Sequence, residues 1–406
     1  MIIRARVIVT MDGDPIEDGA VVTCGDRIAD VGRFADIRRR NGGAVTDFGE
    51  VAVLPGLINA HCHLEYTLLR GAIPPQKSFA EWIGAINAAK ARLQPEDYLR
   101  GIDAGFREAA EFGTTAIANY EAFPELLDRI PPPPMRTWWF AEMIDLREKL
   151  NVTEILRIMR GGFDREKWRG GLGLAPHAPY TASGSLYSDA ADLARRENIL
   201  LSTHLGESQE EMQMFRDSSG PLFGFMKSFG RQINDCGAGS PLAAILEHMA
   251  PDERWIVAHV NELSENDFAL LERVARFHIV HCPRSHCYFG HAPFPLQRLC
   301  ALGFNICVGT DSLASNVNLS LLAELRELQQ NEPSVTAREL VEMATLRGAA
   351  ALSQGSNLGR IQSGFLADLI AIPASPSGHG TYDDIVAFEG VVPWAMIAGE
   401  VLPPNP

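Results

Sequence analysis

Strand-like and helical segments alternate through the middle of the chain, and this alternation limits the folds that the chain can adopt. Eight short apolar segments have the length of strands and end near His61, Asn119, Ala141, Pro176, His204, His259, His281 and Thr310. Longer segments with helical periodicity lie between them, for example at 185–197, 262–276 and 335–352. Eight strand-then-helix units over about 300 residues predict a (β/α)8 TIM barrel, an α/β fold whose chemistry lies at the carboxyl ends of its strands.

The two ends of the chain have a different character. Residues 1–53 form short β-type runs separated by turn signals, and residues 358–406 repeat this pattern. Neither piece is long enough to bury a core by itself. We therefore expect the two ends to form one small β-sandwich domain together, and residues 54–357 to form a catalytic barrel domain.

The composition is that of an ordinary globular protein, with 46% hydrophobic and 21% charged residues. The formal net charge of −15 argues against nucleic acid or an anionic membrane surface as a partner, because both would repel the protein. A small-molecule substrate needs only a local pocket and is compatible with this charge. The chain begins with a strand-like run and has no apolar segment long enough for a signal peptide or a membrane span, so we expect it in the cytoplasm.

Three of the expected strand ends carry side chains that bind metal ions. His61 and His63 are two positions apart on one strand, so both imidazoles face the same side. His204 ends another strand, and Asp311 follows the last one. Each residue alone is more often a cap or a satisfied polar group, and the joint pattern is what favours a metal site. Three imidazoles and one carboxylate suit one divalent ion, which we expect to be Zn²⁺, with Fe²⁺ accepting the same ligands.

Two further side chains at strand ends suit proton transfer. Glu207 lies three residues past His204, close enough to reach over a metal site without binding the ion. The alternative is a carboxylate that only favours the start of a helix through the helix dipole. His259 ends its own strand and could hydrogen-bond a developing oxyanion, while Asp311 could accept the proton of a metal-activated water molecule.

The order and spacing of these residues resemble the amidohydrolase superfamily, over nearly the whole chain. The likeness runs from the Leu-Pro-Gly-Leu-Ile-Asn-Ala-His-Cys-His phrase at 54–63 to the Gly-Phe-Leu-Ala-Asp-Leu phrase at 364–369. The resemblance implies that the metal is held by His61, His63, His204 and Asp311. It also implies that Glu207 and His259 serve as proton shuttle and water-activating partner.

The fourth strand end narrows the resemblance to one branch of the superfamily. Binuclear members place a carbamylated lysine there, where this chain has Pro-His-Ala-Pro-Tyr at 176–180, so the resemblance implies a single metal ion. It also implies that His177 contacts the substrate, the alternative being a packed histidine that backbone groups satisfy. Glu65 and Trp82 are expected to bind substrate, although Trp82 also suits a plain wall or core position. The segment 208–240 is a candidate lid.

The branch indicated is that of the mononuclear deaminases, which includes cytosine, guanine, S-adenosylhomocysteine and aminofutalosine deaminases. The phrases at 63–66, 202–211 and 309–316 look most like aminofutalosine deaminases, which act in the futalosine route to menaquinone. We therefore predict hydrolytic deamination of an aminated purine-type heterocycle or nucleoside, with an aminodeoxyfutalosine-like substrate. The alternatives are adenosine, S-adenosylhomocysteine, guanine or cytosine deamination, and a chlorohydrolase-type displacement on the same scaffold. A non-enzymatic barrel is disfavoured because every expected ligand is present, and a homodimer is expected from the resemblance alone.

Overall fold

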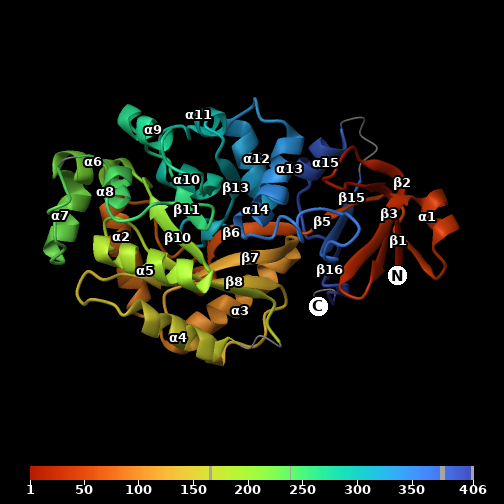
Figure 1. Cartoon of the computed structure of the whole chain (residues 1–406), viewed down its shortest axis with the longest axis horizontal. Coiled ribbons are helices and arrows are strands. Elements are labelled where there is room, and N and C mark those ends of the chain that lie inside the picture. The colour runs from red at the N-terminus through yellow and green to blue at the C-terminus, as the bar shows by residue number, and fades with distance from the viewer. Residues whose placement is uncertain (164–166, 238, 375–379, 404–406) are drawn as a thin grey trace.

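The central barrel is built from parallel strands, as the computed structural model of residues 1–163, 167–237, 239–374 and 380–403 shows (Figure 1). In chain order these strands are β6 (Leu57–His63), β7 (Thr114–Glu121), β8 (Arg136–Met143), β9 (Gly170–Pro176), β10 (Leu200–Leu205), β11 (Trp255–His259), β12 (His278–His281), β13 (Asn305–Val308) and β14 (Asp311–Ser312). Each strand pairs with the next, from β6 to β13. The predicted α/β barrel is confirmed.

The last barrel strand is interrupted, and its two pieces close the ring. β13 pairs with β12, whereas β14 pairs with β6 through Asp311 opposite Cys62 and Ser312 opposite His63. Only Gly309 and Thr310 separate the two pieces. The first and last barrel strands therefore meet at the point where the predicted ligands His63 and Asp311 lie.

Helices surround the barrel, with short helical turns after two of the strands. The bounds are η1 (Leu64–Leu69), α2 (Phe79–Lys90), α3 (Pro95–Glu111), η2 (Pro124–Arg129), α4 (Val152–Gly162), α5 (Gly184–Glu197), α6 (Gln209–Asp217), α7 (Gly220–Ser228), α8 (Pro241–Leu246), α9 (Glu265–Leu271), α10 (Pro283–Phe289), α11 (Leu296–Ala301), α12 (Leu321–Asn331), α13 (Ala337–Met343) and α14 (Leu346–Ala351). One large apolar cluster fills the space between the outer strand faces and the helices.

Two helices differ from their predicted lengths. The pattern over 262–276 yields only α9, and the Arg276 guanidinium donates to the carbonyls of Leu271, the last residue of the helix, and of Val274 beyond it. The pattern over 335–352 is divided into α13 and α14. The carbonyl of Ala344 accepts a hydrogen bond from the backbone N–H of Ile58 at 2.8 Å, so tertiary pairing with the barrel interrupts the helix there.

The chain ends form a second sheet, at the right in Figure 1. Its elements are β1 (Ile2–Ile8), β2 (Ile16–Cys24), β3 (Arg27–Arg33), β4 (Val45–Asp47), β5 (Val51–Pro55), β15 (Leu369–Pro373), β16 (Trp394–Ile397) and β17 (Glu400–Val401), with helices α1 (Phe34–Arg40) and α15 (Thr381–Ala387). All eight strands belong to one hydrogen-bonded sheet, in which β5 lies between β1 and β15. Among the described residues, no helix has the length and apolarity that crossing a bilayer requires.

Candidate active site

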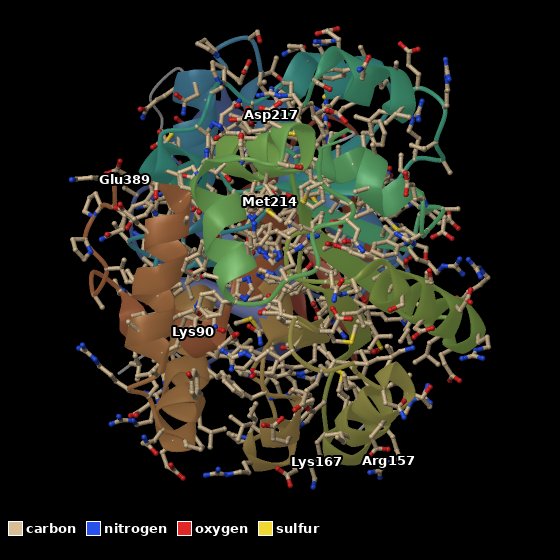
Figure 2. All side chains as sticks on the ribbon, turned by 90° about the vertical axis from the view of Figure 1, so that its left-hand side faces the viewer. Lys90, Arg157, Lys167, Met214, Asp217 and Glu389 are labelled. Atoms are coloured by element: carbon tan, nitrogen blue, oxygen red, sulfur yellow. The ribbon has the colours of Figure 1, made fainter. Side chains whose placement is uncertain are left out.

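A cavity of about 630 Å³ opens at the carboxyl ends of the barrel strands. The predicted site residues that line it are His63, Trp82, His177, His204, Glu207, His259 and Asp311. Figure 2 views the molecule from the end where α6 and α7 lie, and it labels Lys90, a further lining residue at the end of α2. Polar groups lie at the barrel end of this cavity, and aromatic and aliphatic side chains form much of its remaining wall.

The predicted metal ligands converge at the barrel end of the cavity. Nitrogen atoms of His61, His63 and His204 lie within 4.8 Å of one another. One oxygen of Asp311 lies 3.8 Å from Nε2 of His61 and 3.9 Å from Nε2 of His63. Three strands that are far apart in sequence, β6, β10 and β14, therefore bring these four side chains to one point. Donor atoms at these separations suit the coordination of a metal ion.

The hydrogen bonds of these donors fit a metal ion. Nδ1 of His204 donates to the carbonyl of His177 at 2.8 Å, which leaves Nε2 with its lone pair free. His61 is fully buried, and within the described part of the chain neither of its ring nitrogens has a hydrogen-bond partner. An unpaired buried polar atom is costly, so a ligand is the simplest way to satisfy it.

Local sequence sets the positions of the strand-end ligands. The barrel interior receives Ile58 and Ala60 from β6, whereas Cys62 faces outward, and the register shift between Asn59 and Cys62 accounts for this reversal. The reversal turns His61 and His63 into the barrel mouth. The backbones of two other site residues, His259 and Asp311, have φ angles of 72° and 54°, in the left-handed region that non-glycine residues rarely adopt. Such strained positions gather at functional sites.

Asp311 is held from several sides. The hydroxyl of Ser285 donates to one of its carboxylate oxygens at 2.7 Å, and the backbone N–H of Ser312 donates to the other at 2.7 Å. Burial by itself would raise the pKa of Asp311, but the imidazoles of His259 and His63 and the Ser285 hydrogen bond lower it overall. The carboxylate is therefore ionised and fixed in orientation.

Glu207 lies beside this donor set, and its carboxylate faces His259. The two side chains approach to 3.8 Å, and ligand atoms of Glu207, His259 and Asp311 all lie within 4.8 Å of one another. The backbone of Glu207 is anchored, since its N–H donates to Glu211 at 2.8 Å and its carbonyl accepts from Asn261 at 3.1 Å. These bonds hold the backbone of Glu207 in place and leave its carboxylate free to transfer a proton.

Burial controls the protonation of the groups around the centre. It raises the pKa of Glu207 well above the usual range, with Asp311 and Glu211 adding to the shift. Burial also holds the pKa of His61 well below its usual value, and the neighbouring imidazoles lower it further. A neutral imidazole suits metal binding, and a carboxyl group with a raised pKa suits proton transfer near neutral pH.

Three residues predicted to contact substrate occupy different positions. His177 lines the cavity just after β9, and Trp82 forms part of the wall, 4.9 Å from the ring of Phe289. Glu65 lies in η1, is fully buried and is not among the lining residues. Its carboxylate lies 3.7 Å from Nδ1 of His63, so the structure places it behind a predicted ligand rather than in the cavity.

Glu142 was missed from the sequence. Its side chain is 5% exposed and lines the cavity, 3.9 Å from both Nδ1 of His63 and Nε2 of His177. The third strand was expected to end near Ala141, but β8 continues to Met143. Trp138 and Phe140 of this strand face the interior, so the alternation of the strand was the signal that placed residue 142 there as well.

A strand-end centre of three imidazoles and one carboxylate, with a buried acid beside it, defines a hydrolytic barrel of the metal-dependent type. The sequence model of the amidohydrolase family matches residues 52–401. A 5-methylthioadenosine/S-adenosylhomocysteine deaminase of Pyrococcus furiosus is 32% identical over 371 residues, covering 88% of this chain and 81% of the relative. The chain thus belongs to the amidohydrolase family, and it is a hydrolase acting on C–N bonds other than peptide bonds.

Solved structures share the fold over almost the full length. An adenosine deaminase of Xanthomonas campestris with bound zinc has a TM-score of 0.79 and 25% identity, covering 98% of this chain and 92% of that one. An aminofutalosine deaminase of Helicobacter pylori, in complex with methylthio-coformycin, has a TM-score of 0.84 and 23% identity, covering 99% of both chains. At this identity the second likeness concerns the fold.

Proposed function

We propose that the protein is a metal-dependent hydrolytic deaminase of an adenine-type nucleoside. The observation that carries the proposal is the position of Glu207, a buried carboxyl group beside the metal-type donor set and separate from it. Deamination requires a group that moves a proton from water to the departing nitrogen, and a carboxyl group with a raised pKa meets this need near neutral pH.

The metal centre in this proposal consists of His61, His63, His204 and Asp311, and we propose Zn²⁺ as its ion. The zinc in the Xanthomonas campestris relative supports this choice. When bound, such an ion supplies Lewis-acid activation of a water molecule. Glu65, 3.7 Å behind His63, would orient that imidazole as a positioning residue. We also propose that residues 54–357 form the catalytic domain and that 1–53 with 358–406 form the smaller one.

The remaining side chains divide the proton transfers between them. Asp311, ionised and held by Ser285, accepts the proton of the attacking water molecule. Glu207 then delivers its proton to the ring nitrogen, and the proton held by Asp311 passes to the departing amine. As ammonia leaves, Glu207 regains a proton from the hydroxyl group of the adduct, which becomes the carbonyl of the product. Nε2 of His259, buried and without a partner among the described residues, holds the oxygen atom that adds to the ring. Nδ1 of His177 is fixed by Thr181 at 2.6 Å, so its other nitrogen is available to a substrate in the cavity.

The size of the cavity supports a substrate larger than a free base. About 630 Å³ lies within the range of pockets that hold drug-sized ligands, and its outer wall carries apolar residues such as Ile144, Leu146 and Phe229. We propose an adenine nucleoside with a substituent at the 5′ position. 6-Amino-6-deoxyfutalosine and 5′-methylthioadenosine are the two candidates, the first from the phrases around the site and the second from the Pyrococcus furiosus relative.

The test is ammonia release by zinc-loaded protein from 6-amino-6-deoxyfutalosine, 5′-methylthioadenosine, S-adenosylhomocysteine, adenosine, guanine and cytosine. We expect turnover of an adenine nucleoside and none of cytosine. Glu207→Gln is expected to lower kcat by about 10²- to 10⁴-fold while zinc content stays at the wild-type value. The matched control is Glu210→Gln, which changes a carboxylate that accepts hydrogen bonds from the backbone N–H groups of Phe79 and Ala80. Absence of turnover on all six compounds would refute the proposal.

A further inference from the structure

The carboxylate of Glu142 lies in the cavity without a donor from the protein. Its side chain is 5% exposed, and no described residue donates a hydrogen bond to its Oε1. The nearest ring nitrogens, Nδ1 of His63 and Nε2 of His177, are both 3.9 Å away, beyond hydrogen-bond reach. A buried carboxylate is costly without donors, so a ligand is needed to supply them.

Of the two neighbouring histidines, His177 is hydrogen-bonded to another side chain, whereas His63 only lies near a second carboxylate. Glu65 lies nearer to Nδ1 of His63, at 3.7 Å, and is fully buried behind it. The hydroxyl of Thr181 donates to the carbonyl of Ala178, so its oxygen accepts the proton on Nδ1 of His177. Nε2 of His177 then carries a lone pair instead of a proton. Glu142 and His177 therefore present two acceptors, side by side, to whatever fills the cavity.

The chemistry of an adenine nucleoside limits what can meet these two acceptors. Its only N–H and O–H donors are the exocyclic amine and the hydroxyl groups of the sugar. The amine is bonded to the carbon that reacts, so it must lie at the metal-type centre. The sugar hydroxyls are the donors that remain, and a carboxylate is well suited to accept hydrogen bonds from the hydroxyls of a ribose.

We propose that Glu142, together with Nε2 of His177, binds the vicinal 2′- and 3′-hydroxyl groups of the substrate's ribose. This inference rests on the proposed function and adds the part of the substrate that determines specificity. Glu142 belongs to β8 and His177 follows β9, and these neighbouring strands pair side by side up to Met143 and Pro176. The acceptor pair is thus built on rigid elements. Lys90, labelled in Figure 2, lines the same cavity.

The experiment compares kcat/KM for adenosine and 2′,3′-dideoxyadenosine in zinc-loaded wild type and in Glu142→Gln. Because hydrogen bonds to a charged group are involved, we expect wild type to prefer adenosine by about 30-fold or more. The preference is expected to fall below about 5-fold in Glu142→Gln, mainly through a higher KM for adenosine. Glu148→Gln makes the same chemical change at an exposed position of the same cavity and should keep the wild-type preference.

Two results would overturn the inference: a wild-type enzyme that uses both nucleosides equally, or a preference that Glu142→Gln leaves unchanged. Failure of the proposed function looks different, because wild type would then release ammonia from neither nucleoside. In that event calorimetry of inosine and 2′,3′-dideoxyinosine binding decides the matter. Equal affinity of the wild type for the two would overturn the inference, and tighter binding of inosine that Glu142→Gln abolishes would support it.

Discussion

Gly309 separates the two pieces of the last barrel strand, and replacing it with alanine should disturb the metal centre. A Cβ atom at this position would lie 2.6 Å from the carbonyl oxygen of His61 and 2.9 Å from both its backbone nitrogen and its Cβ. These are backbone atoms of β6 or lie next to that backbone, so they cannot turn away as a flexible side chain would. The strand that carries His61 and His63 must shift relative to Asp311.

The size of the effect follows from these contacts. Relief of contacts this short requires a displacement of roughly 0.5–1 Å, and overpacking of this kind costs about 1–3 kcal/mol of folding free energy. A misplacement near 1 Å lowers the rate of a positioned reaction by about 10²-fold. Disturbed support of metal ligands lowers metal affinity by about 10- to 100-fold. We therefore expect Gly309→Ala to fold, to bind zinc more weakly and to lose most of its activity.

The assay is competition for zinc against a chromophoric chelator, together with urea unfolding of the metal-free protein and steady-state kinetics. Gly42→Ala is the matched control, because a Cβ there meets no atom within 4 Å and the backbone φ is unstrained. Both variants remove a glycine from the unfolded chain, so that contribution cancels in the comparison. Wild-type zinc affinity and kcat in Gly309→Ala would show that the ring closure does not set the ligand geometry.

Further predictions concern the metal, a buried acid and the loop of His177. Chelation should lower the free energy of unfolding by about 2.7 kcal/mol relative to protein in zinc at 100 times its dissociation constant, and cobalt or zinc should restore it, as thermal unfolding can show. Burial raises the pKa of Glu211 to about 8. Between about pH 5 and pH 8 this carboxyl group is therefore protonated in the folded state and ionised in the unfolded state. Wild type therefore loses stability as pH rises through this window, and the advantage of Glu211→Gln in urea unfolding should grow by about 1–3 kcal/mol; a constant difference would contradict the burial argument. Arg231 donates to two carbonyls of the loop that follows His177, so Arg231→Met should raise KM about 10-fold. Arg216→Met, which removes the surface ion pair with Asp217, should leave KM unchanged.

The strand ends were the part of the fold that the sequence predicted best. β9, β11 and β12 end at the predicted residues Pro176, His259 and His281, because parallel barrel strands are buried on both faces and appear as continuous apolar runs. The helices were less predictable. The division between α13 and α14 depends on a bond from Ile58, nearly 300 residues earlier in the chain, which no local pattern contains.

The candidate site shows the same contrast. The sequence was sufficient to predict that the four metal ligands meet, because each lies at the end of an apolar run and the strands of a barrel end at one face. These ligands are His61, His63, His204 and Asp311. The position of Glu65 behind His63 could not, since it depends on how η1 folds back after β6. Sequence periodicity determines which face a residue occupies along a strand, but not which side chains lie one layer further from the cavity.

The position of β5 has a consequence for how the protein is made. This strand is synthesised early, yet one of its two neighbours in the sheet, β15, comes from near the other end of the chain. A growing polypeptide on the ribosome therefore exposes the open edge of an apolar strand for most of its synthesis. Exposed edges of this kind recruit other chains, so expression yield should depend strongly on chaperone capacity and on an intact C-terminus.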